Sequence, residues 1–384
     1  MQDASQLVAQ LVATPSPNSG EPRGEPLTAC EGAVAELVAD YLTDLGLEVR
    51  RQHVVGERAN VLCEIAGTGD RRLLLDAHMD TVPAEGMAVE PFSGEVRDGK
   101  VFGRGACDDK GTLAAIVLAL KDLVENEPPA CTVQFSATVD EEVAFRGMRA
   151  LAAEGLEVDA AIIGEPTNLS IVVATKGALR WRIRTRGTAA HSSAPELGVN
   201  AIYGMAEVIR ALREQYIPRL AERVHPLLGS PTFSVGTIEG GSQVNIVPEE
   251  CTIEVDRRTL PGETPEPVLA EVEAVLAGLR AARPDLNVRT EEPDLFFPAV
   301  QTPENSEIVA VAREAVRDVV GRAEVGGVPF TSHASVVAPL GIPCVLFGPG
   351  DGALAHSATE YVPIEQVEQA ARIFAGICRR FGRT

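Results

Sequence analysis

Strand-like runs that end abruptly in charged side chains constrain this chain most. The stretch LLLDAHMDTVP, residues 73–83, begins as an unbroken apolar run and then places His78 and Asp80 two residues apart. Runs at 131–139 and 160–163 end similarly, in DEE and in GEPTN. Continuous apolar runs are typical of strands covered on both faces, as in the parallel sheets of α/β proteins. In such sheets ligands bind beyond the strand ends.

The pattern changes at ALRWRIRTRG, where apolar and basic residues alternate with period two and predict a strand with one solvated face. A strand, helix, strand, strand, helix, strand order follows to about residue 293, which suggests a small split-βαβ sandwich. After it the α/β pattern resumes. We therefore expect a discontinuous α/β domain, residues 1–177 and 293–384, with an inserted α+β domain at 178–292.

Charge and composition exclude several classes of partner. The 384 residues carry a formal net charge of -21, which disfavours nucleic acid and anionic membranes as partners. The N-terminal stretch has no basic region ahead of an apolar core, and the apolar stretch TLAAIVLALKDLV is too short to cross a bilayer. Seven scattered cysteines without a CxxC pair suit a reducing compartment, so we expect a cytoplasmic protein.

Polar residues at further strand ends and loops extend this pattern. Each of them alone has a bland explanation, such as a helix cap or a packed histidine. Together they should converge on one sheet edge, where so many carboxylates would repel one another unless cations were bound. Histidines with carboxylates are the ligand set of zinc and its first-row neighbours. The candidates beside His78 and Asp80 are Asp108 and Asp109 in GRGACDDKG, Asp140, Glu141 and Glu142 in VDEEVAF, Glu165 in IIGEPTN and His356 in GPGDGALAHSATEYV.

Hydrolysis by a metal pair assigns different roles to these carboxylates. Two ions about 3.5–4 Å apart need a carboxylate that bridges them, and they polarise a carbonyl and activate water. A further carboxylate must stay free of the metal to move protons, a division that the adjacent Glu141 and Glu142 allow. Asp80 is placed to orient the imidazole of His78.

With HMDTVP, GRGACDDKG, DEE, GEPT and AHSATEYV in this order, the chain resembles the dinuclear-zinc family that includes acetylornithine deacetylase, succinyl-diaminopimelate desuccinylase, aminoacylase and the glutamate-releasing carboxypeptidases. The resemblance spans nearly the whole chain. It implies two divalent ions, zinc first and cobalt or manganese as alternatives. It also implies that Glu141 is the general base, with Asp80 behind His78, and that the Asp108–Asp109 peptide is cis. The implied ligands are His78, Asp108 and Glu165 for one ion and Asp108, Glu142 and His356 for the other.

The inserted segment resembles the ferredoxin-like lid and dimerisation domain of that family. Within it, GTAAHSSAPELGVNAI implies that His191 stabilises the oxyanion, often in a neighbouring subunit's site. GGSQVNIVPEECTIEVDRRTLPGE implies that Asn245 and Arg258 contact the substrate's carboxylate, for which an arginine fork is suited. We therefore expect a homodimer.

One stretch departs from the family pattern. FTSHAS carries His333 where many relatives have an aspartate. His333 is either a new polar contact for the acyl or side-chain group of the substrate, or simply a loop residue.

These features predict metal-dependent hydrolysis of the amide bond of an N-acyl-L-amino acid, with N-acetylornithine as the best single substrate. A carboxypeptidase, a dipeptidase or a succinyl-diaminopimelate desuccinylase would use the same machinery. A binding protein that keeps the fold without turnover would have lost a ligand or the base, whereas all of them are present. An unrelated co-catalytic aminopeptidase would lack the AHSSAPELGVNAI segment.

Overall fold

The computed structural model describes residues 3–20 and 31–383, and the chain divides into two compact units. The first unit comprises residues 1–173, 302–326 and 332–384, and the second comprises 174–301 and 327–331. The second unit therefore extends past the expected end at residue 292. The physical reason is that strand β13 (Leu295–Phe297) pairs with a strand of the inserted sheet.

No helix among the described residues is both long and apolar enough to cross a bilayer.

The first unit alternates strands and helices, as the sequence predicts. The helices and strands are α1 (Ala4–Val12), α2 (Gly32–Asp44), β1 (Val49–Val55), β2 (Arg58–Ile65), β3 (Arg72–His78), β4 (Glu95–Arg97), β5 (Lys100–Phe102), α3 (Lys110–Glu125), β6 (Thr132–Thr138), α4 (Arg146–Gly155), β7 (Ala160–Gly164), β8 (Ile171–Thr175), α8 (Glu307–Val320), β15 (Val325–Val328), α9 (Ala334–Val337), β16 (Cys344–Phe347), β17 (Tyr361–Pro363) and α10 (Ile364–Arg380).

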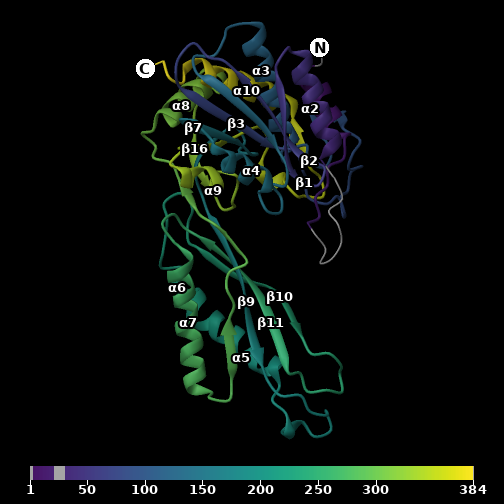
Figure 1. Cartoon of the computed structure of the whole chain (residues 1–384), viewed down its shortest axis with the longest axis vertical. Helices are drawn as coiled ribbons and strands as arrows, with labels where there is room; N and C mark the ends of the chain where they lie inside the picture. The colour runs from purple at the N-terminus through teal and green to yellow at the C-terminus, as the bar shows by residue number, and fades with distance from the viewer. Residues whose placement is uncertain (1–2, 21–30, 384) are drawn as a thin grey trace. The chain divides into compact units, whose positions relative to one another are not determined.

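The main sheet runs in the order β1-β2-β6-β3-β7-β16-β8-β14, with β14 at Val300–Gln301. Strand β3 lies between β6 and β7 and is parallel to both. Strand β16 is parallel to β7, and Figure 1 labels β3, β7 and β16 in the same sheet. The apolar residues of β3 are almost fully buried, because helices such as α3 and α4 pack on the sheet. Parallel neighbours bring their carboxyl ends to one edge, so the polar residues that follow β3, β6, β7 and β16 begin at the same place.

The second unit is the expected split-βαβ sandwich. Its antiparallel sheet has the order β10-β11-β9-β12, which places the first and third strands of the unit in the middle. This confirms the inserted ferredoxin-like fold. Its elements are β9 (Gly177–Arg186), α5 (Ala201–Ala211), a π-helical turn (Leu212–Tyr216), α6 (Ile217–Leu220), β10 (Thr232–Gly240), β11 (Glu250–Thr259), α7 (Pro265–Ala282), β12 (Asn287–Thr290) and β13.

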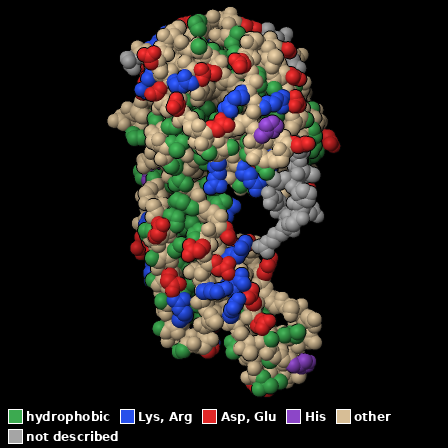
Figure 2. Space-filling view, in the orientation of Figure 1, with side chains coloured by type: hydrophobic (Ala, Val, Ile, Leu, Met, Phe, Trp, Pro, Cys, Tyr) green, Lys and Arg blue, Asp and Glu red, His purple; other side chains and the backbone are tan. Residues whose placement is uncertain are grey.

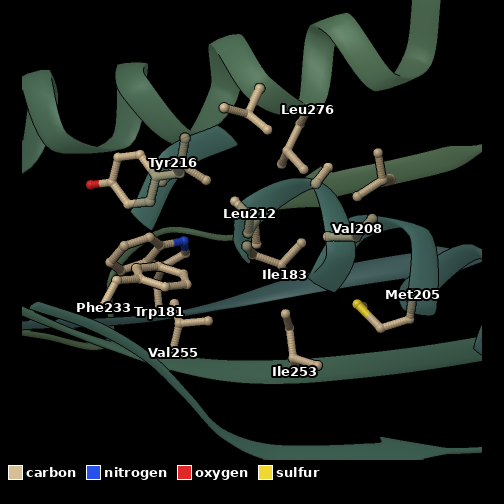
Figure 3. Close-up of a cluster of buried hydrophobic side chains, with 14 of the residues drawn as sticks. Trp181, Ile183, Met205, Val208, Leu212, Tyr216, Phe233, Ile253, Val255 and Leu276 are labelled. Carbon is tan, nitrogen blue, oxygen red and sulfur yellow. The ribbon is translucent and has the colours of Figure 1, made fainter. Parts of the chain in front are cut away.

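The core of the second unit lies between its helices and one face of the sheet. Figure 3 shows Ile183 of β9 close to Leu212 and to Val208 of α5, and Trp181 of β9 beside Phe233 at the other side of the cluster. An aromatic cluster closes one end of this core. The ring of Phe233 lies 6.0 Å from that of Trp181 and makes a T-shaped contact with Tyr216 at 5.3 Å.

The opposite face of β9 carries the arginines of the alternating run. Figure 2 shows basic and acidic side chains intermingled over the part of this unit where β9 and β11 are labelled in Figure 1. Cross-strand ion pairs explain why four arginines are tolerated on one strand: like charges on neighbouring positions are each offset by an acidic residue of β11. The pairs are Arg180–Asp256 (2.7 Å), Arg182–Glu254 (2.8 Å), Arg184–Glu250 (2.8 Å) and Arg186–Glu250 (3.6 Å), so the last two arginines share one glutamate.

Candidate metal centre

The two oxygens of Asp108 face two different histidines. Nε2 of His78 lies 3.0 Å from Oδ1 of Asp108, and Nε2 of His356 lies 3.4 Å from Oδ2. Nε2 of His356 also lies 3.2 Å from Oε2 of Glu142. Among the described residues, Asp108, Glu142 and His356 have donor atoms that all lie within 4.8 Å of one another. A carboxylate shared in this way has the arrangement that a bridge between two ions requires.

His78 is oriented by its other ring nitrogen. Its Nδ1 lies 3.0 Å from the carbonyl oxygen of Asp80 and 3.4 Å from Oδ1 of Asp80. When Nδ1–H donates to these oxygens, the neutral ring presents the lone pair of Nε2 toward Asp108, as metal ligation needs. Without metal, burial alone would lower the pKa of His78, but its hydrogen bonds to Asp108 and Asp80 raise that pKa well above its usual value.

Asp80 also fixes the main chain that carries the paired glutamates. Its Oδ1 accepts the backbone N–H of Glu141 at 3.0 Å, and its Oδ2 accepts that of Glu142 at 3.1 Å. Oε1 of Glu142 accepts the N–H of Val82 at 3.2 Å, which leaves Oε2 for the cluster around His356. One buried carboxylate thus sets the positions of His78, Glu141 and Glu142 together.

The electrostatics of this cluster fit divalent cations. Burial, followed by the charge of Asp108, raises the pKa of Glu142. Burial and the charges of Glu141 and Asp108 raise the pKa of Glu165, and burial with the charge of Glu142 does the same for Glu141. Hydrogen bonds to Asp108 and Glu142 raise the pKa of His356 to about 10. Carboxylates that resist ionisation together would be stabilised in their charged forms by cations, and imidazole with carboxylate donors suits zinc and its neighbours.

The remaining first-unit residues are placed as follows. Glu165 follows β7 and is 5% exposed. It lies close enough to Glu141 and Asp108 for their negative charges to raise its pKa, after the effect of burial. The Asp108–Asp109 peptide is cis, as the resemblance implies. His356 has a positive φ of 59°, a conformation that is uncommon outside glycine and is often found at functional sites.

Sequence reasoning missed Asn18, which links two buried carboxylates beneath the cluster. Its Nδ2 donates to Oδ2 of Asp80 at 2.8 Å and to Oδ1 of Asp140 at 3.0 Å. Asp140 in turn pairs with the buried Arg58 at 3.2 Å. The only sequence signal was the run SPNS of serine, proline and asparagine after the first helix, and such runs usually mark turns.

His333 does not join the cluster of metal-binding candidates. It is 1% exposed, and its Nδ1 lies 2.8 Å from Oδ2 of the buried Asp76. Its ring makes an edge contact with Phe145 at 5.1 Å, and Oδ1 of Asp76 accepts a hydrogen bond from Ser136 at 2.6 Å. The expectation that His333 contacts the substrate gains no support from this position.

His191 and Asn245 lie in neighbouring loops of the second unit, where both are exposed. The backbone N–H of Ser192 donates to the carbonyl oxygen of Asn245 at 3.0 Å. The backbone N–H of Ser193 donates to Nδ1 of His191 at 3.2 Å. Because Nδ1 accepts, the neutral ring of His191 carries its proton on Nε2 and presents an N–H donor there.

Arg258 lies elsewhere in the same unit. It is half-buried near the end of β11, and its Nε donates to Oδ1 of Asp256 at 2.8 Å. The loop that holds Asn245 precedes β11, so the two residues stand at opposite ends of this strand. Arg258 lies eight positions after Glu250, the first residue of β11, which corresponds to roughly 26 Å.

Comparisons with known proteins agree with this geometry. The model of peptidase family M20/M25/M40 matches residues 74–380. The chain is 32% identical over 332 residues to an acetylornithine deacetylase of Myxococcus xanthus, a match that covers 85% of this chain and 84% of that protein. The aminopeptidase PepT of Bacillus cereus superposes with a TM-score of 0.79 and 26% identity, over 98% of this chain and 97% of that one. An M20 family metallo-carboxypeptidase from Sulfolobus solfataricus, 21% identical, has the same fold with a TM-score of 0.81, over 99% of both chains. The family resemblance of the sequence is thereby confirmed: the chain belongs to peptidase family M20/M25/M40 and is a metal-dependent hydrolase.

Proposed function

We propose that this hydrolase cleaves the amide bond of N-acyl-L-amino acids and that N-acetylornithine is its substrate. The observation that carries the hydrolytic part is the shared carboxylate of Asp108, each oxygen of which faces a different histidine. The 32% identity to an acetylornithine deacetylase over most of both chains supports the choice of substrate. Dipeptides, C-terminal peptide bonds and N-succinyl-diaminopimelate are the alternatives that the same chemistry would serve.

We assign two divalent ions, zinc first and cobalt or manganese as alternatives, to two overlapping ligand sets. Bound ions of this kind polarise the scissile carbonyl and acidify the attacking water. The ligand sets are His78, Asp108 and Glu165 for one ion and Asp108, Glu142 and His356 for the other.

Glu141 is assigned the proton transfers. It accepts a proton from the attacking water and delivers it to the nitrogen of the leaving amine, so the amide C–N bond breaks to give a carboxylate and a free amino acid. Asp80 holds the main chain of Glu141 and the ring of His78. It thereby fixes the position of the base relative to a metal ligand.

The second unit supplies substrate contacts. His191 donates a hydrogen bond from Nε2 to the developing oxyanion, and Asn245 and Arg258 bind the carboxylate of the amino acid. The hydrogen bond from Ser193 to Nδ1 of His191 supports the first assignment because it fixes the donor on Nε2. A guanidinium with one edge held by Asp256 keeps further N–H groups for a carboxylate.

A substrate panel tests the function. Protein stripped with a chelator and reloaded with zinc or cobalt should hydrolyse N-acetylornithine with a higher kcat/KM than N-succinyl-diaminopimelate, N-acetylmethionine, acylglutamates or dipeptides. Stripped protein without added metal should be inactive, because the carbonyl is then not polarised. Preference for another panel member would replace the proposed substrate and keep the chemistry. Failure to bind any metal would overturn the proposal.

We infer that the active form is a homodimer whose sites are shared between subunits. Asn245 and Arg258 are separated by roughly 26 Å or more along β11, further than one N-acyl amino acid extends. Two copies of the chain would allow Arg258 of one subunit and Asn245 of the other to meet one substrate.

Strand β10 is a terminal strand of its sheet, and such edges pair readily with a second copy. Apolar side chains around β10 and α5 support this contact: Leu197 (75% exposed), Tyr203 (73%), Ile238 (56%) and Val244.

Mixing two inactive variants tests the shared site. The variants Glu141→Gln and His191→Ala, unfolded and refolded together, should regain about a quarter of wild-type activity, since half of the dimers are mixed and each mixed dimer has one intact site. Each variant refolded alone is the control. Activity in the mixture no higher than the average of the two controls would show that each site is built within one chain.

A cytoplasmic location is also proposed. All cysteines among the described residues, six in number, are buried free thiols, which supports a reducing compartment. Fractionation of the native host checks this proposal. Recovery of the protein outside the cytosol would contradict it.

A further inference from the structure

Glu360 is a buried carboxylate that serves two groups of partners. It follows His356 by four residues and is 1% exposed. Its Oε1 accepts the backbone N–H of Cys107 at 3.0 Å and that of Asp108 at 3.1 Å. Its Oε2 pairs with Nη1 of Arg104 at 2.5 Å. The peptide that carries the shared metal ligand is therefore held by a residue of the segment that carries His356.

Arg104 connects this pair to a third segment. The guanidinium is almost fully buried, and its Nε donates to the carbonyl oxygen of Pro83 at 3.1 Å. Pro83 follows Asp80 by three residues, on the loop after β3. The backbone N–H of Gly103 also donates to the carbonyl oxygen of Glu360 at 3.1 Å. Arg104 and Glu360 thus join the loop that follows His78 to the segments that carry Asp108 and His356.

General stability does not account for such a pair. Removing two charges from water costs about as much as their attraction returns, so a buried ion pair adds little net stability compared with apolar side chains of the same volume. What apolar side chains could not do is accept the two N–H groups at Cys107 and Asp108. Residues that hydrogen-bond to a metal ligand, without binding the metal themselves, fix the orientation of that ligand.

We infer that Glu360 is a positioning residue which, paired with Arg104, sets where the main chain places the carboxylate of Asp108 between the two ions. The inference rests on the proposed function of the metal centre. Glu360 is not among the residues assigned as metal ligands or as substrate contacts. It acts through the N–H groups at Cys107 and Asp108, and its loss displaces the one ligand that both ions share.

Metal titration of the full-length chain tests this role without substrate. In Glu360→Gln an amide replaces the carboxylate, so either the two N–H groups or Arg104 must face an NH₂ donor. Calorimetry with zinc should show at least about tenfold weaker binding than wild type, the usual loss when a partner of a metal ligand is removed. The visible absorption of the cobalt-loaded protein should change in position or intensity. With active protein, kcat should fall by about tenfold or more while KM stays nearly constant.

Two further variants separate positioning from folding. The double variant Glu360→Leu, Arg104→Leu removes both buried charges, so it should melt nearer to wild type than Glu360→Gln does, yet still bind metal weakly. Glu263→Gln is the matched control, because Glu263 pairs with the buried Arg257 in the second unit at 2.9 Å. That control should lower the melting temperature and leave the zinc affinity and the cobalt spectrum unchanged.

The outcomes are distinguishable. Wild-type zinc affinity and an unchanged cobalt spectrum in Glu360→Gln, with only a lower melting temperature, would overturn the positioning role and leave the metal centre intact. Recovery of wild-type metal affinity in the double variant would also overturn the positioning role. Arg104 and Glu360 would then serve only to neutralise each other's buried charge. If wild-type protein binds no metal, it is the proposed function that fails.

Discussion

Replacing Glu141 with glutamine is expected to lower kcat by roughly 10³- to 10⁴-fold while both metal ions stay bound. The backbone of Glu141 is held by Asp80 at 3.0 Å, and this hydrogen bond does not depend on the side chain. The ligands assigned to the two ions also keep their positions in the variant. Only the group that accepts the proton of water and returns it to the amine is lost.

Metal content and turnover must therefore be measured on the same sample. The proton role requires zinc affinity equal to that of wild type together with the loss of kcat. Glu141→Asp is the matched control, because it keeps the carboxylate one methylene further back and should recover part of the rate. A near-normal rate in Glu141→Gln would show that the base is another residue, and loss of one ion would make Glu141 a ligand.

Changing His191 to alanine is expected to lower kcat by about a hundredfold, the usual effect of removing one oxyanion donor. The donor is the N–H at Nε2, because Nδ1 accepts the backbone N–H of Ser193 at 3.2 Å. Its hydrogen bond strengthens as charge develops on the oxygen, so the loss should fall on kcat more than on KM.

The second unit provides a closely matched control for this variant. His225 is half-buried, and its Nδ1 accepts the backbone N–H of Leu227, two residues along, at 3.2 Å, as Nδ1 of His191 accepts that of Ser193. Its Nε2, however, lies 3.3 Å from Oε1 of Gln301. His225→Ala should leave kcat and KM unchanged. If His191→Ala raised KM alone, His191 would be a binding residue rather than an oxyanion donor.

Local sequence patterns predicted the parts of this molecule that local physics determines. The run from Arg72 to Ala77 was expected to be a buried strand, and β3 spans Arg72–His78 because both of its faces are covered. The period-two run became β9 with its arginines on the solvated face. Convergence of the ligands followed from parallel strand order, which required only that β3, β6 and β7 lie side by side.

Contacts between distant segments could not be predicted in this way. Asn18 meets Asp80 and Asp140 across 62 and 122 residues, and nothing in its local sequence distinguishes it from a turn residue. Glu360 lay within a quoted motif, but its partners at Cys107 and Asp108 are more than 250 residues away. His333 was expected to be either a substrate contact or a loop residue, and its buried position became evident only from Phe145 and Asp76, which pack around its ring.

The ligands assigned to the metal centre are divided between two segments of one discontinuous unit, and this fixes an order of events during synthesis. His78, Asp108, Glu142 and Glu165 leave the ribosome before the second unit, whereas His356 follows it. Domains fold largely as they emerge, so the second unit can form its own core while one coordination position is still untranslated. Capture of both ions would then require translation past residue 356, and a nascent or truncated polypeptide that ends before this residue would lack the full site.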